Sequence, residues 1–91
     1  MNNSKRFAVF FRIRQPIDKE WIVDALNGNA HYAYTFGTLH EAIDGYNSLS
    51  ERGAFDDCDY GVFKLSNDEE WKKVRLTYDK DRRRFIPFDN R

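Results

Sequence analysis

The chain has 91 residues, of which 41% are hydrophobic and 16% aromatic, and its formal net charge is zero. This length predicts one domain over residues 1–91 with a modest core, and the single cysteine excludes an internal disulfide. The sequence has no apolar run of about 18 residues, as a membrane-spanning helix needs, and residues 1–6 lack the apolar stretch of a secretory signal, so we expect a cytoplasmic protein.

The first predicted element is a strand over residues 6–14, where apolar side chains alternate with others. One face is apolar throughout and is a candidate for the core; it carries Phe7, Val9, Phe11 and Ile13. The opposite face starts apolar and ends basic, which is typical of a partly exposed sheet face; it carries Ala8, Phe10, Arg12 and Arg14.

A short helix is predicted over residues 18–27, where apolar residues recur at helical spacing. Asp18 is its candidate N-cap, and the pair Asn27-Gly28 predicts its end. The Trp-Ile-Val run favours a strand over Glu20–Leu26 instead, and this alternative stays open. The following segment, His31–Phe36, alternates in character and predicts a strand.

The clearest local signals predict a helix over residues 38–52. Thr38-Leu39-His40-Glu41 matches a capping box, in which the Thr38 side chain accepts a hydrogen bond from the backbone N–H of Glu41. An apolar stripe follows at helical spacing; it consists of Leu39, Ala42, Ile43, Tyr46 and Leu49. Gly53 supplies a stop at the C-terminal end.

Three strand-like runs close the chain, at Tyr60–Leu65, Trp71–Tyr78 and Arg84–Phe88. Polar turns at 66–69 and 79–81 join them into two hairpins, and Pro87 indicates an edge strand. The sequence therefore predicts an α+β fold: a single small domain whose antiparallel sheet of four to five strands is packed on one face by one long and one short helix.

No cluster of residues has the spacing of a known catalytic, metal or cofactor site. A zinc site needs three or four ligands, and the two histidines, His31 and His40, have no Cys or second His at such an interval. The glycines never fall closer than eight residues apart, which excludes the glycine-rich phosphate loops. The aspartates around Cys58 are expected to raise the pKa of its thiol and make it a poor nucleophile. We expect no cofactor and no enzymatic activity, with a small ribonuclease-like enzyme that uses His31 or His40 as an alternative.

Charge is unevenly spread, because residues 30–60 carry six acids against Arg52 alone, whereas residues 1–14 and 61–91 have a basic excess. The acidic face of the predicted long helix and the loop after it form a candidate contact surface for a protein partner. Exposed tyrosines are suited to anchor such a surface. The predicted partner-binding residues are Glu41, Asp44, Glu51, Asp56, Asp57 and Asp59, with Tyr46 and Tyr60 as anchors.

The basic segments support an alternative, a small RNA- or DNA-binding domain. Aromatic and Arg side chains on a sheet face stack on bases and hold phosphates. The candidates are Phe10, Arg12, Arg14, Lys73, Arg75, Arg82, Arg83 and Arg84. The zero net charge argues against this alternative, because a dedicated nucleic-acid binder usually has a basic excess. A homodimer, paired through an edge strand near Pro87, is a further alternative.

The run Tyr32-Ala33-Tyr34-Thr35-Phe36 leads into Thr38-Leu39-His40-Glu41-Ala42-Ile43, and an acidic turn and the strands at Tyr60–Leu65 and Trp71–Tyr78 follow. This layout, over about half of the chain, resembles small phage-encoded accessory proteins of the anti-CRISPR and anti-restriction type. The resemblance implies stoichiometric inhibition of a host protein complex without a cofactor, in the host cytoplasm. It carries over no residue roles, because that group shares no fold or site, and the zero net charge departs from its strongly acidic DNA mimics.

The residues and the resemblance together predict a non-enzymatic protein-binding module. Its expected partner is a host defence or nucleic-acid-handling protein complex, which it would inhibit by binding through the acidic helix and loop.

Overall fold

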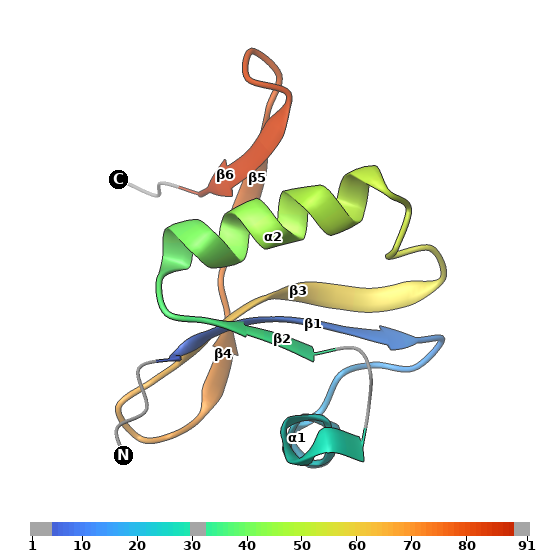
Figure 1. Cartoon of the computed structure of the whole chain (residues 1–91), viewed down its shortest axis with the longest axis vertical. Helices are drawn as coiled ribbons and strands as arrows, with labels where there is room; N and C mark the ends of the chain where they lie inside the picture. Colours follow the sequence, from blue (N-terminus) through green and yellow to red (C-terminus); the bar gives the residue numbers. More distant parts are fainter. Residues whose placement is uncertain (1–4, 30–32, 89–91) are drawn as a thin grey trace.

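The computed structural model describes residues 5–29 and 33–88, and the strand β1 (Phe7–Ile13) lies at its centre. In chain order the other elements are α1 (Lys19–Asp24), a π-helical turn η1 (Ala25–Asn29), β2 (Ala33–Phe36), α2 (Leu39–Glu51), β3 (Cys58–Leu65), β4 (Trp71–Lys73), β5 (Leu76–Asp79) and β6 (Arg84–Pro87). One antiparallel sheet has the strand order β2-β1-β3-β4, and β5 and β6 form a separate two-stranded sheet. The predicted α+β class, with one long and one short helix, is confirmed (Figure 1).

Alternate side chains of β1 belong to two different cores, one on each face of the sheet. Val9 and Phe11 pack with the apolar stripe of α2, whereas Ala8 and Phe10, both 0% exposed, pack with Ile22 of α1. Figure 1 shows the two helices on opposite sides of the sheet. The expectation that the helices lie on one face of the sheet is therefore wrong. The expectation that the second face of β1 is partly exposed is confirmed, because Ala8 and Phe10 are buried and Arg14 is exposed. Helix α1 covers the apolar half of that face.

Helix α1 begins at its predicted cap, because the Asp18 carboxylate accepts a hydrogen bond from the backbone N–H of Trp21 at 2.8 Å. The helical stretch continues from α1 through η1, and it ends near the predicted stop, because Gly28 in η1 has a φ of 88°, a left-handed conformation that glycine adopts without a Cβ clash. The strand alternative for Glu20–Leu26 is wrong. The cap and the burial of Ile22 outweigh the β-propensity of the Trp-Ile-Val run.

Helix α2 is the element that the sequence predicts best. The Thr38 hydroxyl accepts from the backbone N–H of Glu41 at 3.1 Å, and Gly53, with a φ of 74°, follows the helix end. The predicted stripe is confirmed, because Ala42, Ile43, Tyr46 and Leu49 are all buried and Leu39 packs partly buried against the same core.

The predicted strand Trp71–Tyr78 is split in two, and each half pairs with a different strand. β4 pairs with β3, whereas β5 pairs with β6. Between them, Val74 donates its backbone N–H to the carbonyl oxygen of Val62 at 2.7 Å, and Arg75 is the point where the chain leaves β3. The β5–β6 hairpin then passes α2 and projects beyond it (Figure 1).

Asn47 fixes this hairpin against α2. Its side chain, 8% exposed, donates to the carbonyl oxygens of Ile43 at 2.9 Å and Phe85 at 3.0 Å, and it accepts from the N–H of Phe85 at 2.7 Å. The rings of Tyr46 and Phe85 meet edge to face at a centroid distance of 5.2 Å. The backbone N–H and C=O of Phe85 in β6 are thus both bonded to Asn47 of α2, which fixes the position of the hairpin against this helix.

Candidate functional site

The departure of the chain at Arg75 leaves part of β3 without a neighbour. β4 pairs only with Phe63–Leu65, and the Val74–Val62 hydrogen bond ends that ladder. In the described ranges, no strand pairs with the outer edge of Cys58–Gly61. The start of β3 is therefore paired to β1 on one side and open on the other.

The open edge presents the backbone of Tyr60. Leu65 donates its N–H to Arg6 on the β1 side of β3, whereas Val62 accepts from Val74 on the outer side. Because the N–H and C=O groups of successive residues point to alternate sides of a strand, those of Tyr60 lie on the same side as those of Val62. Tyr60 thus directs one donor and one acceptor outward.

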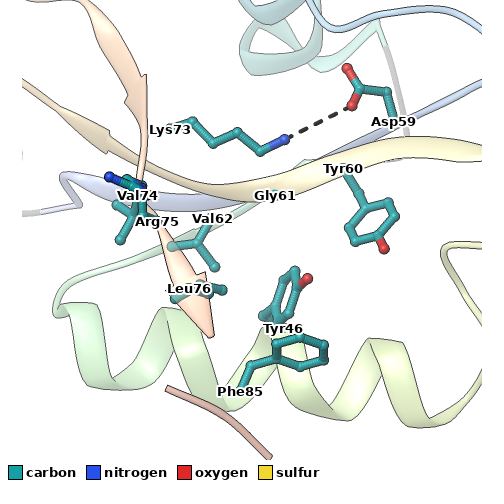
Figure 2. A pocket seen from close by; sticks show the side chains of 10 residues that line it. All are labelled: Tyr46, Asp59, Tyr60, Gly61, Val62, Lys73, Val74, Arg75, Leu76 and Phe85. Atoms are coloured by element: carbon teal, nitrogen blue, oxygen red, sulfur yellow. Dashed lines mark ion pairs between the residues drawn. The ribbon is translucent and has the colours of Figure 1, made fainter. Parts of the chain in front are cut away.

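A groove of about 540 Å³ lies along this edge, within the range of roughly 300–1,000 Å³ that is typical of ligand sites. Figure 2 shows Lys73 and Asp59 on one side of β3 and the rings of Tyr46 and Phe85 on the other. We call it the edge groove; it is lined by Tyr46, Asp59, Tyr60, Gly61, Val62, Lys73, Val74, Arg75, Leu76 and Phe85.

Three aromatic rings form the apolar wall of the edge groove. Tyr60 is 37% exposed and stacks on the buried ring of Phe55, at 4.4 Å and an interplanar angle of 3°. Tyr46 is 6% exposed and contacts both Tyr60, at 6.0 Å, and Phe85. Burial raises the pKa of the Tyr46 phenol to about 12, and the nearby Tyr60 adds to the effect. Tyr60 is therefore the ring that a partner can reach, and Tyr46 is part of the wall behind it.

Lys73 and Asp59 form the polar wall. The stem of Lys73 lies across Gly61, where a Cβ would come within 2.5 Å of Lys73 Cε, so glycine permits the close approach. The ammonium is 4.0 Å from Asp59, whose other carboxylate oxygen accepts from the backbone N–H of Ile17 at 2.8 Å. Asp59 therefore holds the segment before α1 in place as well as lining the groove.

The predicted acidic surface is interrupted in the structure. Asp44 accepts a hydrogen bond from the Arg84 guanidinium and lies 3.3 Å from His40. The hydrogen bond from Arg84 is the main cause that holds the pKa of Asp44 below its usual value. The exposed acids that remain are Glu41, Glu51, Asp56 and Asp57. Asp57 adopts a φ of 61° in the turn before β3.

The predicted nucleic-acid residues do not gather on one face. Phe10 is fully buried, so its ring is not offered for stacking on a base. Arg12 instead closes the loop after β1, donating to the Pro16 carbonyl at 2.7 Å and the Gln15 side chain at 2.6 Å. The others are spread over three places: Arg14 is exposed at the end of β1, Lys73 and Arg75 line the edge groove, and Arg82, Arg83 and Arg84 belong to the hairpin.

Cys58 and His40 are the reactive side chains that remain in the described part of the chain. Burial raises the pKa of the Cys58 thiol, and the carboxylates of Asp57 and Asp56 raise it further, in the expected direction. His40 is 82% exposed and pairs with Asp44; His31 lies outside the described residues. Within residues 5–29 and 33–88, no three His, Cys, Asp or Glu side chains lie close enough together to hold a metal ion.

Sequence reasoning missed Gly61, Asn47 and Phe85. A glycine inside a strand signals a close approach by another group, and this signal was present at Gly61. Asn47 lies beside the apolar stripe of α2, and its role depends on a hairpin 38 residues away. Such a long-range contact leaves no local pattern.

Comparisons with protein-family models, with curated proteins and with solved structures found no match to this chain. None of the helices in the described part of the chain has the length and apolar character needed to cross a membrane.

Proposed function

We propose that this chain is a protein-binding module and that the edge groove, with the acidic loop Asp56–Asp57 beside it, is its contact surface. One observation carries the proposal: an exposed tyrosine, two cations and an unpaired strand edge converge on one groove. Interface energy concentrates in Tyr, Trp and Arg side chains that occupy such central positions. The acids of the loop favour encounter with a basic partner surface.

The proposed mode of action is stoichiometric inhibition of a host protein complex in the host cytoplasm, without a cofactor. The resemblance in layout to small phage-encoded accessory proteins supports this mode, and a host defence or nucleic-acid-handling complex is the proposed target. A protein that inhibits by occupying a surface of its target needs a binding surface but no reactive group. The edge groove, made of aromatic rings, cations and backbone groups, agrees with this mode.

The proposal is tested by affinity capture from a host lysate, with and without nuclease, read by mass spectrometry. We expect one stoichiometric protein partner that survives nuclease and that is lost with Tyr60→Ala. The matched control is Tyr34→Ala, because Tyr34 is 45% exposed on β2, at the opposite edge of the sheet. Equal capture by the parent and the Tyr60 variant would remove the edge groove from the contact surface.

The acidic loop is tested by combining Asp56→Lys with Asp57→Asn. Asparagine is chosen at the second position because it tolerates the left-handed backbone there. We expect slower association with the partner and an unchanged melting temperature. Association that stays as fast as in the parent would limit the contact surface to the groove.

Nucleic-acid binding is the second candidate, and the position of the hairpin favours it. Arg82 and Arg83 are exposed beside Lys80 at a turn that projects beyond α2 (Figure 1). This candidate predicts capture that disappears with nuclease and an affinity that falls steeply with salt. A ribonuclease would use His40, which lines a hollow of about 390 Å³ with Arg82 and Arg84; it requires RNA cleavage that His40→Ala abolishes.

A further inference from the structure

We infer that the edge groove binds an extended segment of a partner protein, which adds as a new strand to the open edge of β3. The inference rests on the proposed function and specifies the chemistry of its partner. Strand addition to an exposed sheet edge is a recurring mode of peptide recognition, in which backbone hydrogen bonds give affinity and side-chain pockets give specificity.

The backbone of β3 is ready for such a strand. The outward N–H and C=O of Tyr60 lie in line with those of Val62, which already accepts a hydrogen bond from Val74. An added segment would take the place that β4 would occupy if it continued past Val74. It would thus extend an existing ladder, and β1 already holds the other side of Cys58–Gly61 in a regular antiparallel register.

The two walls of the edge groove predict the side chains of the segment. Successive side chains of a strand point to opposite faces, so one set meets the rings of Tyr60, Tyr46 and Phe85 and the other meets Lys73. The ring wall suits apolar or aromatic side chains. Among the described residues, the ammonium of Lys73 forms one long ion pair, with Asp59, and its side chain is 57% exposed, so it suits an acidic side chain. Arg75 adds a second cation at the end of the groove. The segment alternates apolar and acidic residues.

A partner segment fits this site better than a second copy of the chain. Of the chain's other edge strands, β2, β4 and β6 carry no acid to meet Lys73. The one acid of β5, Asp79, already accepts hydrogen bonds from the backbone N–H groups of Asp81 and Arg82. Nucleic acid fits less well, since it has no alternating amide and carbonyl groups to extend the ladder.

The test selects peptides on the folded chain from a random peptide display library and measures their affinity for variants at Tyr60. Tyr60→Ala removes the ring and keeps the N–H. Tyr60→Pro removes both, and proline is tolerated where the N–H of an edge strand points outward. We expect selected peptides with apolar and acidic residues in alternation, and an affinity at least about tenfold lower for the proline variant than for the alanine variant.

A second measurement does not depend on whether the proline variant folds. Addition of a selected peptide to the unmodified chain is expected to slow hydrogen exchange of the Tyr60 amide, because that amide enters the ladder. The inference is overturned if no alternating peptides are selected, if the Tyr60 amide exchanges as before, or if the two variants bind alike. Self-association that needs the Tyr60 N–H would assign the edge to a second copy and also overturn it.

The outcomes separate this inference from the proposed function. Partner capture that depends on the Tyr60 ring but not on its N–H keeps the protein-binding module and rejects strand addition. Loss of any nuclease-resistant partner, with peptide binding intact, would instead reject the proposed inhibitor while leaving the groove a peptide site.

Discussion

The contact between Asn47 and Phe85 gives the sharpest test of the fold. Asn47→Ala removes a buried side chain that donates to the carbonyl oxygen of Phe85 and accepts from its N–H. The carbonyl of Ile43 loses an additional donor but remains within the helix. The variant therefore leaves two backbone groups of one β6 residue without their partner.

The expected cost follows from those two groups. A buried donor or acceptor that loses its partner costs about 1–3 kcal/mol. Phe85 is only partly buried, so water reaches some of the exposed groups and the lower end applies to each. We expect Asn47→Ala to lower the free energy of unfolding by about 2–3 kcal/mol in total. In a domain of this size that corresponds to a fall in melting temperature of about 10–20 °C.

Thermal and urea unfolding, followed by circular dichroism, measure the change. Ser48→Ala is the matched control, because Ser48 is the next residue of α2 and is exposed. Hydrogen exchange should also rise across β5 and β6 before it rises in β1. A loss smaller than about 0.5 kcal/mol, the range of an ordinary surface substitution, would refute the reasoning that Asn47 holds the hairpin.

Three further predictions concern single groups. The raised pKa of Tyr46 means that its phenol stays protonated in the folded chain at a pH where a free tyrosine ionises. The contribution of this phenol to the free energy of unfolding is complete below pH 10 and should be lost as the pH rises to about 12. Ultraviolet titration should find a last ionising tyrosine in the parent that Tyr46→Phe lacks. Gly53→Ala should lower the free energy of unfolding by about 1 kcal/mol, because alanine is strained at a φ of 74°, and an unchanged urea midpoint would contradict this. The lowered pKa of Asp44 means that its ion pair with Arg84 stabilises the fold at neutral pH and is lost as the pH falls through the folded pKa; urea midpoints of the parent and Asp44→Asn should therefore differ at pH 7 and converge in acid.

The sequence was most informative where structure depends on neighbouring residues. The cap at Thr38, the apolar stripe and Gly53 all act within α2, and each is as predicted. The α+β class follows from the same local patterns. The position of α1, on the face of the sheet opposite α2, was not predictable from local patterns. The alternation in β1 shows that its second face starts apolar, but it does not show which element covers Phe10.

The candidate site was predicted only in fragments. Tyr46, Tyr60 and Asp59 stood in one predicted set and Lys73 and Arg75 in another, and a single groove contains all five. The side chains over Trp71–Tyr78 alternate in the same way whether the run pairs with one strand or with two. No glycine or proline marks Val74-Arg75, where the chain changes its pairing partner. The pairing of Asp44 with Arg84 likewise depends on where the hairpin docks.

The break after β4 also gives the chain a tethered competitor for its own groove. If the β3–β4 register is continued past Val74, Leu76 falls opposite Tyr60 and Tyr78 falls opposite Cys58. β5 is thus long enough to pair with Cys58–Tyr60, and its alternate side chains would point to the same faces as those of β4. In the structure it pairs with β6 instead and leaves this edge of β3 open. A tethered segment acts at an effective concentration on the order of millimolar, so an external strand would compete with β5 whenever β5 separated from β6. If the edge groove binds a strand as proposed, its affinity is therefore expected to depend partly on how strongly β5 pairs with β6.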